Sequence, residues 1–265
     1  MIIDFHTHVF PDDIADNAVS KLARSAHITP CNDGTLKSLL SAMQKSGVDL
    51  SVILPVMTHP KQFRRINEVA AEYNRSYSGR VLSFGGIHPD CDSIEECFRI
   101  LVDLGFRGIK LHPDYQQVMF NDARYKKIIE LACENDMIIS VHAGYDLSMG
   151  YPAHCSPTMA LEILRELNPP KLVLAHCGGF DQWNDVERLL VGQEVYLDLA
   201  YTLGFIPEEQ LVRIIRHHGA DRILFATDNP WQDQANVIRR IQALPIPASD
   251  KQKIRGDNAG DLLGL

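Results

Sequence analysis

Short apolar runs rich in β-branched residues alternate with longer segments of helical periodicity along the whole chain. Eight of the short runs predict strands, at Ile2–Phe5, Leu50–Val56, Val81–Ile87, Gly108–Leu111, Met137–Val141, Lys171–Ala175, Val195–Leu199 and Arg222–Thr227. The longer segments predict helices at Leu36–Lys45, Ile66–Tyr77, Ile94–Asp103, Ala123–Glu134, Thr158–Leu167, Asp181–Leu190, Glu208–His217 and Asp233–Ala243. Strands separated by single helices favour right-handed βαβ crossovers and a parallel sheet.

Eight such units predict an α/β fold in which a single (β/α)₈ TIM barrel spans residues 1–265 as one domain. No Gly/Ser-rich or Pro-rich linker divides the chain, and one barrel of this kind typically takes about 250 residues. An open doubly wound sheet is the alternative, but no Gly-x-Gly-x-x-Gly phosphate loop follows the first strand. In a barrel, we expect the chemistry at the C-terminal ends of the strands.

Composition and charge narrow the classes of partner. The net charge is −8 and no basic block stands out, which argues against binding to nucleic acid. No apolar run approaches the ~18 residues of a membrane span, and the first residues do not resemble a signal peptide. The six cysteines form no Cys-x-x-Cys pair, so a reducing, cytoplasmic setting is expected. A small-molecule substrate is therefore the expected partner, and a homodimer is compatible with the sequence.

Side chains that can bind a metal gather where the predicted strands end. His6 and His8 close the first strand, and His142, His176 and Asp228 follow the fifth, sixth and eighth strands. Because side chains alternate along a strand, His6 and His8 are expected to point to the same side. With His142 and Asp228 they would supply three neutral nitrogens and one carboxylate, which suit Zn²⁺ or another first-row divalent ion.

Asp4 has the same strand parity as His6 and His8 and is expected deeper in the barrel. From there its carboxylate can accept the second N–H of a metal-binding imidazole and fix that ring's tautomer. The alternative is a polar residue with a purely structural partner.

The opening stretch Ile3-Asp4-Phe5-His6-Thr7-His8 resembles that of the amidohydrolase superfamily, especially its amidohydrolase-related branch. His142-Ala143-Gly144, His176-Cys177-Gly178-Gly179 and Thr227-Asp228-Asn229-Pro230 resemble later motifs of the same branch, in the same order. The resemblance covers almost the whole chain. It implies a metal-dependent enzyme with the ligands His6, His8, His142 and Asp228. It also implies that His176 is either an acid/base beside the metal or a ligand to a second ion.

The fourth strand leaves the number of metal ions open. It reads Gly108-Ile109-Lys110-Leu111-His112, without the bridging Glu of the TatD-like nuclease branch. Binuclear hydrolases of the superfamily can use a carbamylated Lys as the bridge, and Lys110 occupies a suitable position. An ordinary lysine that pairs with a carboxylate or an anionic substrate is the favoured interpretation. One ion, most simply Zn²⁺, is therefore expected, with two ions as the alternative.

The leading functional hypothesis is a hydrolase that attacks an amide, ester or lactone carbonyl with metal-activated water, with Asp228 and His176 as catalytic residues. The alternative is a lyase, either a non-oxidative decarboxylase or a hydratase of a cyclic or unsaturated carboxylic acid, in which His176 or Asp228 protonates carbon. Phosphoester hydrolysis and a non-catalytic metal-binding scaffold are less favoured. The candidate substrate-binding residues are Lys110, His112, Tyr145 and His154.

Overall fold

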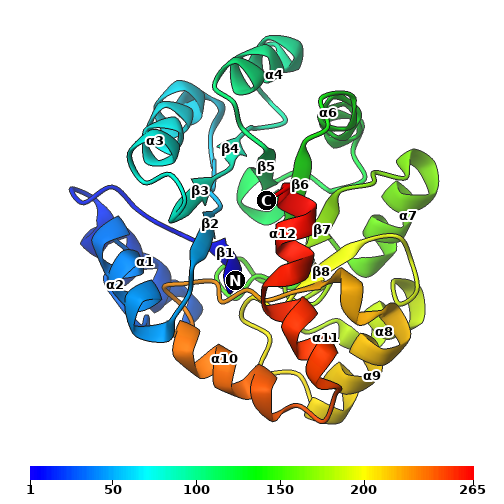
Figure 1. Cartoon of the computed structure of the whole chain (residues 1–265). Coiled ribbons are helices and arrows are strands. Elements are labelled where there is room, and N and C mark those ends of the chain that lie inside the picture. Colours follow the sequence, from blue (N-terminus) through cyan, green and yellow to red (C-terminus); the bar gives the residue numbers. More distant parts are fainter.

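The computed structural model describes residues 1–265 and shows a ring of parallel strands inside a layer of helices (Figure 1). The strands are β1 (Ile3–Thr7), β2 (Leu50–Ile53), β3 (Val81–Ser83), β4 (Gly85–Gly86), β5 (Gly108–Leu111), β6 (Ile138–Val141), β7 (Leu172–Leu174), β8 (Tyr196–Asp198) and β9 (Ile223–Leu224). Only Phe84 separates β3 from β4, so these two strands together occupy one position in the ring. All eight predicted strand positions are therefore occupied, which confirms the predicted TIM barrel.

Backbone hydrogen bonds join the first and last strands of the ring. The strands pair in sequence order from β1 to β3 and from β4 to β9, and every pair is parallel. The amide of Phe5 donates to the carbonyl of Phe225 at 2.9 Å, and that of Asp228 donates to the carbonyl of His6 at 2.8 Å. The segment that follows β9 thus lies beside β1, where it brings Asp228 next to the His6 backbone.

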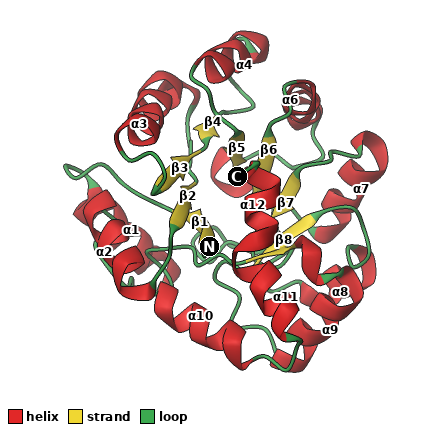
Figure 2. Cartoon of the chain, viewed as in Figure 1, coloured by secondary structure: helices red, strands yellow, loops and turns green.

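Most of the helices form the outer layer of the molecule, whereas the C-terminal helix lies across the middle of the ring (Figure 2). The helices are α1 (Ala15–Ala26), α2 (Leu36–Ser46), α3 (Phe63–Ser76), α4 (Ile94–Asp103), α5 (Pro113–Gln116), α6 (Ala123–Glu134), α7 (Pro157–Leu167), α8 (Trp183–Leu189), α9 (Glu208–His218), α10 (Gln234–Ala243), α11 (Ala248–Gln252) and α12 (Asn258–Leu263). Short 3₁₀ turns lie at Pro60–Gln62 and Ala220–Arg222, and a π-helical turn at Lys253–Asp257 joins α11 to α12. No helix has the length and apolar character needed to cross a membrane.

The eight predicted helices are all present, but the sequence pattern missed α1, the short α5, and α11 with α12. In α1 only Val19 and Leu22 are large apolar residues, so its helical periodicity is weak in the sequence. The predicted strand Arg222–Thr227 is also shorter in the structure, where β9 ends at Leu224. Beyond β9 the amide of Thr227 donates to the side chain of Asp4.

The inside of the barrel is filled with apolar side chains at its N-terminal end. Its core comprises Ile3, Phe5, Leu50, Val52, Leu54, Phe84, Ile138, Val173 and Leu224 together with Ala259, Leu262 and Leu263 of α12. Figure 1 shows α12 lying across the middle of the ring, next to the N-terminus. Because α12 closes this end, a cavity in the barrel has to open at the opposite end, where the strands terminate.

A β-bulge in β1 changes which side chains face the barrel axis. Ile3 and Asp4 pair with consecutive residues of β2, but the three steps from Asp4 to Thr7 match only two steps on β2. Ile3 and Phe5 face the core, so Asp4 between them faces outward, where it accepts hydrogen bonds from Thr227 Oγ1 at 2.6 Å and Gln234 Nε2 of α10 at 2.8 Å. The bulge then brings His6 to the inner side. The prediction that Asp4 shares the side of His6 is wrong, because the bulge interrupts the two-residue alternation.

We expect Phe84→Ala to lower the free energy of unfolding by about 3–5 kcal/mol, since it empties a fully buried site inside the barrel. The ring of Phe84 packs edge-on against Phe5 with ring centroids 5.9 Å apart, and this contact would be lost as well. Urea denaturation followed by circular dichroism measures the change. Phe205→Ala is the matched control, because Phe205 is 48% exposed and its removal should cost clearly less. Equal losses in the two variants would contradict this account of the core.

Candidate metal centre

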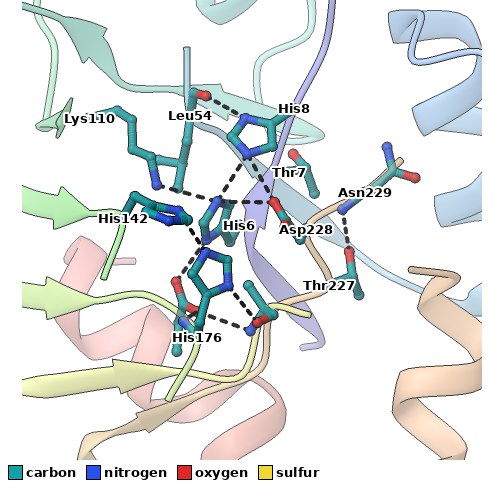
Figure 3. A network of polar contacts seen from close by, with 12 residues as sticks. His6, Thr7, His8, Leu54, Lys110, His142, His176, Thr227, Asp228 and Asn229 are labelled. Atoms are coloured by element: carbon teal, nitrogen blue, oxygen red, sulfur yellow. Dashed lines mark hydrogen bonds and ion pairs between the residues drawn. The ribbon is translucent and has the colours of Figure 1, made fainter. Parts of the chain in front are cut away.

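His6, His8 and Asp228 converge at the C-terminal end of the barrel (Figure 3). His6 Nε2 lies 3.1 Å from His8 Nε2. Asp228 Oδ1 lies 3.4 Å from the first of these nitrogens and 3.0 Å from the second. Three of the four predicted metal ligands therefore lie in one group, built from the end of β1 and the segment that follows β9.

The partners of the two imidazoles determine which nitrogens are free. His6 Nδ1 lies 2.9 Å from the carboxylate Oδ2 of Asp198, and His8 Nδ1 lies 2.8 Å from the carbonyl oxygen of Leu54. Both partners are acceptors, so each Nδ1 carries the hydrogen and each Nε2 presents a lone pair. Two lone pairs and a carboxylate oxygen at these separations repel one another unless a cation lies between them. The donor set therefore fits a divalent first-row metal ion.

The protonation states of the group also suit a metal. Burial lowers the pKa of His6 well below its ordinary value, and the nearby Lys110 ammonium adds to this effect, so the imidazole is neutral. Burial by itself would raise the pKa of Asp228, but its interactions with the side chains of His6 and His8 hold it below its ordinary value. The site thus offers a neutral His6 imidazole and an ionised Asp228 carboxylate at neutral pH.

His142, the fourth predicted ligand, lies beside this group and contacts His176. His142 Nδ1 is 3.0 Å from His176 Nε2, and His176 Nδ1 donates to the carbonyl of Ala200 at 2.8 Å. His142 Nε2 is buried without a hydrogen-bond partner, 3.9 Å from Asp114 and 3.8 Å from Asp146. With His112 and Asp146, His142 forms a second group of metal-binding side chains. The assignment of His142 to the first ion stays a prediction.

Asp198 is the residue of this site that the sequence reasoning missed. It is fully buried at the end of β8, where its Oδ2 accepts from His6 and its Oδ1 accepts from the backbone amides of His176 and Ala200, both at 3.0 Å. Burial raises the pKa of Asp198. Its signal in the sequence is an acidic residue inside the apolar run Val195–Leu199, since a buried carboxylate requires partners.

Three residues of the site have a backbone conformation that is unusual for side chains larger than glycine. His176, Cys177 and Asp228 have φ values of 58°, 55° and 62°, in the left-handed region. Hydrogen bonds from their backbone amides hold them there: His176 donates to Asp198 Oδ1, Cys177 to the carbonyl of Asp198, and Asp228 to the carbonyl of His6. Such strain is typical of functional sites that the surrounding structure positions.

The predicted substrate-binding residues divide into two pairs. His112 and Tyr145 line a cavity of about 630 Å³ above the metal group. Lys110 and His154 do not line it: Lys110 Nζ is buried 3.3 Å from His6 Nε2, and His154 Nδ1 lies 3.0 Å from Asp114. Burial lowers the pKa of Lys110 to about 8. The other aromatic side chains that line the cavity, apart from histidines, are Phe10, Tyr73, Tyr115, Phe180, Tyr201 and Trp231.

A sequence profile described as amidohydrolase matches residues 3–265 of the chain. No curated protein matches it. Among solved structures, an uncharacterised TIM-barrel protein from Bordetella bronchiseptica superimposes with a TM-score of 0.83 at 18% identity, covering 99% of this chain and 98% of that one. The 2,6-dihydroxybenzoate decarboxylase from Rhizobium gives 0.74 at 19% identity over the same shares of the two chains. A dihydroxybenzoic acid decarboxylase from Polaromonas, solved with bound manganese, gives 0.72 at 17% identity over 100% and 97%.

We expect Asp198→Asn to weaken metal binding by about 10- to 100-fold, because His6 Nδ1 and the His176 amide lose the carboxylate that orients them. Competition with a chromophoric chelator measures the affinity, and circular dichroism checks the fold. Asp103→Asn removes an exposed carboxylate at the end of α4 and should leave the affinity unchanged. An Asp198→Asn protein with unaltered metal affinity would remove Asp198 from the centre.

The number of ions tests the role of Lys110. If Lys110 is an ordinary lysine, the purified protein should hold about one ion per chain, with or without bicarbonate. The Lys110→Met variant should also hold about one ion per chain. Elemental analysis of the dialysed protein gives the stoichiometry. Two ions per chain, with one lost on Lys110→Met, would instead identify a bridging carbamate.

Proposed function

We propose, given that the chain belongs to the amidohydrolase family, that it is a metal-dependent lyase that decarboxylates a small aromatic or unsaturated carboxylic acid. The family match confirms the resemblance seen in the sequence motifs. Two of the similar structures are decarboxylases of dihydroxybenzoic acids. The structural similarity of this chain to these decarboxylases supports the lyase alternative over the hydrolysis that the sequence favoured. Hydrolysis stays a prediction, which the assay below also tests.

The observation that carries the proposal is the position of the metal group on the floor of a cavity with aromatic walls. A flat acid can stack its ring against Tyr145, Phe180 or Trp231 while its oxygens reach toward His8 and Asp228. A divalent cation held by His6, His8, Asp228 and His142 would polarise those oxygens. The cavity walls keep water away from the ring and hold it in one orientation.

The reaction needs a group that delivers a proton to carbon, and His176 is better suited to this than Asp228. His176 lines the cavity, and its Nδ1 donates to the carbonyl of Ala200, which leaves Nε2, 3.0 Å from His142 Nδ1, as the nitrogen that can exchange a proton. The lowered pKa of Asp228 keeps its carboxylate ionised, which suits a ligand more than an acid. A protonated His176 would transfer its Nε2 proton to the carbon that bears the carboxylate. The electron pair of the breaking C–C bond then returns to the ring as carbon dioxide leaves.

The identity of the ion is part of the proposal. Three imidazoles and a carboxylate suit Zn²⁺, which the sequence predicts, but the same donors also accept Mn²⁺. The manganese in the Polaromonas enzyme supports including that ion in the assay. Reconstitution of the metal-free protein with each ion separately identifies the one that sustains turnover.

Incubation of the metal-loaded protein with a panel of hydroxylated benzoic acids, including 2,6-dihydroxybenzoate, should release carbon dioxide and the corresponding phenols. Mass spectrometry identifies the phenols, and a coupled assay measures carbon dioxide. His176→Asn should lower kcat by about 10²–10⁴-fold with metal content retained, since it removes the proton donor and not a ligand.

His27→Asn is the matched control, because His27 is exposed at the left-handed C-cap of α1, where Asn is readily accommodated. Its kcat should equal that of the unaltered protein. Cleavage of an amide, ester or lactone without carbon dioxide release would return the assignment to a hydrolase. Unchanged turnover in His176→Asn would exclude His176 as the acid.

A further inference from the structure

The cavity above the metal group continues into an apolar groove between α1 and α3, which are neighbours in the helix layer (Figure 1). One wall is formed by Ile14, Ala18, Leu22 and Ala26. These four residues are spaced by four along the chain, so they lie on one face of α1 over a length of ~18 Å. The wall is thus a continuous apolar stripe about three turns long.

The facing wall belongs to α3 and has a similar pattern. Ile66, Val69, Ala70 and Tyr73 line the groove from this side, and their spacing of three and four also places them on one helical face. Ile53, Leu54 and Pro55, from β2 and the residues after it, complete the lining between the two helices. Two apolar helix faces therefore border one cavity, and no side chain fills the space between them.

The packing of α1 explains why this stripe is left without a protein partner. Only Ala15 and Val19 of this helix are buried, and Val19 packs against the loop at Gly34, where a Cβ would lie 2.6 Å from Val19 Cγ2. The helix is thus attached through a different set of residues from those that line the groove. Ile14 remains 49% exposed although it lies in the stripe. The stripe thus forms an apolar wall of the cavity that no other part of the chain covers.

The groove and the metal centre belong to one cavity, since the same space is lined by His8, His176 and Asp228. A molecule anchored at the metal group can therefore extend between α1 and α3 without leaving the protein. The two helix walls are mainly aliphatic: Tyr73 is the hydrogen-bonding side chain among their apolar residues, and the charged lining residues Asp13 and Arg65 are exposed. A peptide would leave its backbone groups unpaired here, whereas a hydrocarbon chain would not.

We propose that the groove between α1 and α3 binds an extended hydrocarbon chain of the substrate, whose acidic head group occupies the metal centre. The substrate class is then an alkyl-substituted aromatic or unsaturated carboxylic acid. The assignment of the acidic head group rests on the proposed function, whereas the assignment of the apolar tail rests on the lining of the groove.

Binding of butanoate, octanoate and dodecanoate to the metal-loaded protein, measured by calorimetry, tests the tail directly. Each buried methylene should increase affinity roughly fourfold until the groove is filled. Ala18→Trp places a large side chain in the α1 wall and should bring the affinity for dodecanoate close to that for butanoate, with butanoate binding unchanged. Val69→Trp, on the α3 wall, should have the same effect, and it replaces Ala18→Trp in the test if that variant fails to fold.

Lys21→Trp adds the same side chain at an exposed position of α1 that does not line the cavity, and it should preserve the dependence on chain length. Equal affinity for the three acids would overturn the proposal. So would a wall variant that weakens all three acids equally. A change in oligomeric state on Ala18→Trp, without a chain-length effect, would assign the groove to a second copy of the chain.

Binding and turnover separate the tail from the reaction. Dependence of binding on chain length, without carbon dioxide release from any of the hydroxylated benzoic acids, would support the groove and contradict the lyase assignment. Carbon dioxide release from a hydroxylated benzoic acid, without dependence of alkanoate binding on chain length, would support the lyase and overturn the inference about the tail.

Discussion

The carboxylate of Asp198 is the contact on which the geometry of the centre depends. One of its oxygens fixes the tautomer of His6, and the other holds the backbone amide of His176. Since His6 is on β1 and His176 follows β7, this single side chain at the end of β8 sets the positions of a metal-binding nitrogen and a proton donor together. A buried carboxylate is costly to desolvate, and the three hydrogen bonds from His6 Nδ1 and the amides of His176 and Ala200 offset that cost. A displacement of Asp198 would therefore shift the imidazoles of both His6 and His176.

Asp4 performs a parallel task on the other side of the barrel wall. It faces away from the axis and holds Thr227 through both the backbone amide and the hydroxyl group. Burial raises the pKa of Asp4 to about 7, and the hydrogen bonds from Thr227 and Gln234 oppose that shift. Thr227 immediately precedes Asp228, so Asp4 orients the Asp228 carboxylate through the backbone. Asp198 orients the imidazole of His6 directly, through its Nδ1. The two carboxylates hold the centre from outside and inside the strand ring.

The two ends of the barrel have different roles for a simple structural reason. At the N-terminal end α12 adds Ala259, Leu262 and Leu263 to the interior core, so that side is closed. At the other end the strands stop and polar residues replace apolar ones, which leaves a cavity above the metal group. The weak attachment of α1 extends this cavity sideways between helices. A polar floor with an apolar extension is suited to a ligand that has an acidic head and a hydrocarbon tail.

Much of this protein was determined by its sequence alone, because periodicity and motif order are local properties of the chain. The eight strands and the main helices follow from the periodicity of apolar residues. The convergence of His6, His8 and Asp228 follows from their positions at the ends of predicted strands. The motifs also indicated the family that the profile identifies. The ligand role of His142 and the catalytic role of His176 remain predictions.

Only the tertiary structure decided three further features. The bulge in β1 placed Asp4 and His6 on opposite sides of the strand, which strand alternation could not anticipate because the extra residue depends on pairing with β2. The role of Asp198 required His6 and His176, distant in sequence, to meet at β8. The groove between α1 and α3 exists because α1 packs through Ala15 and Val19 and leaves another face uncovered. Each feature depends on contacts between segments far apart in the chain, and a pattern read along one segment carries no information about them.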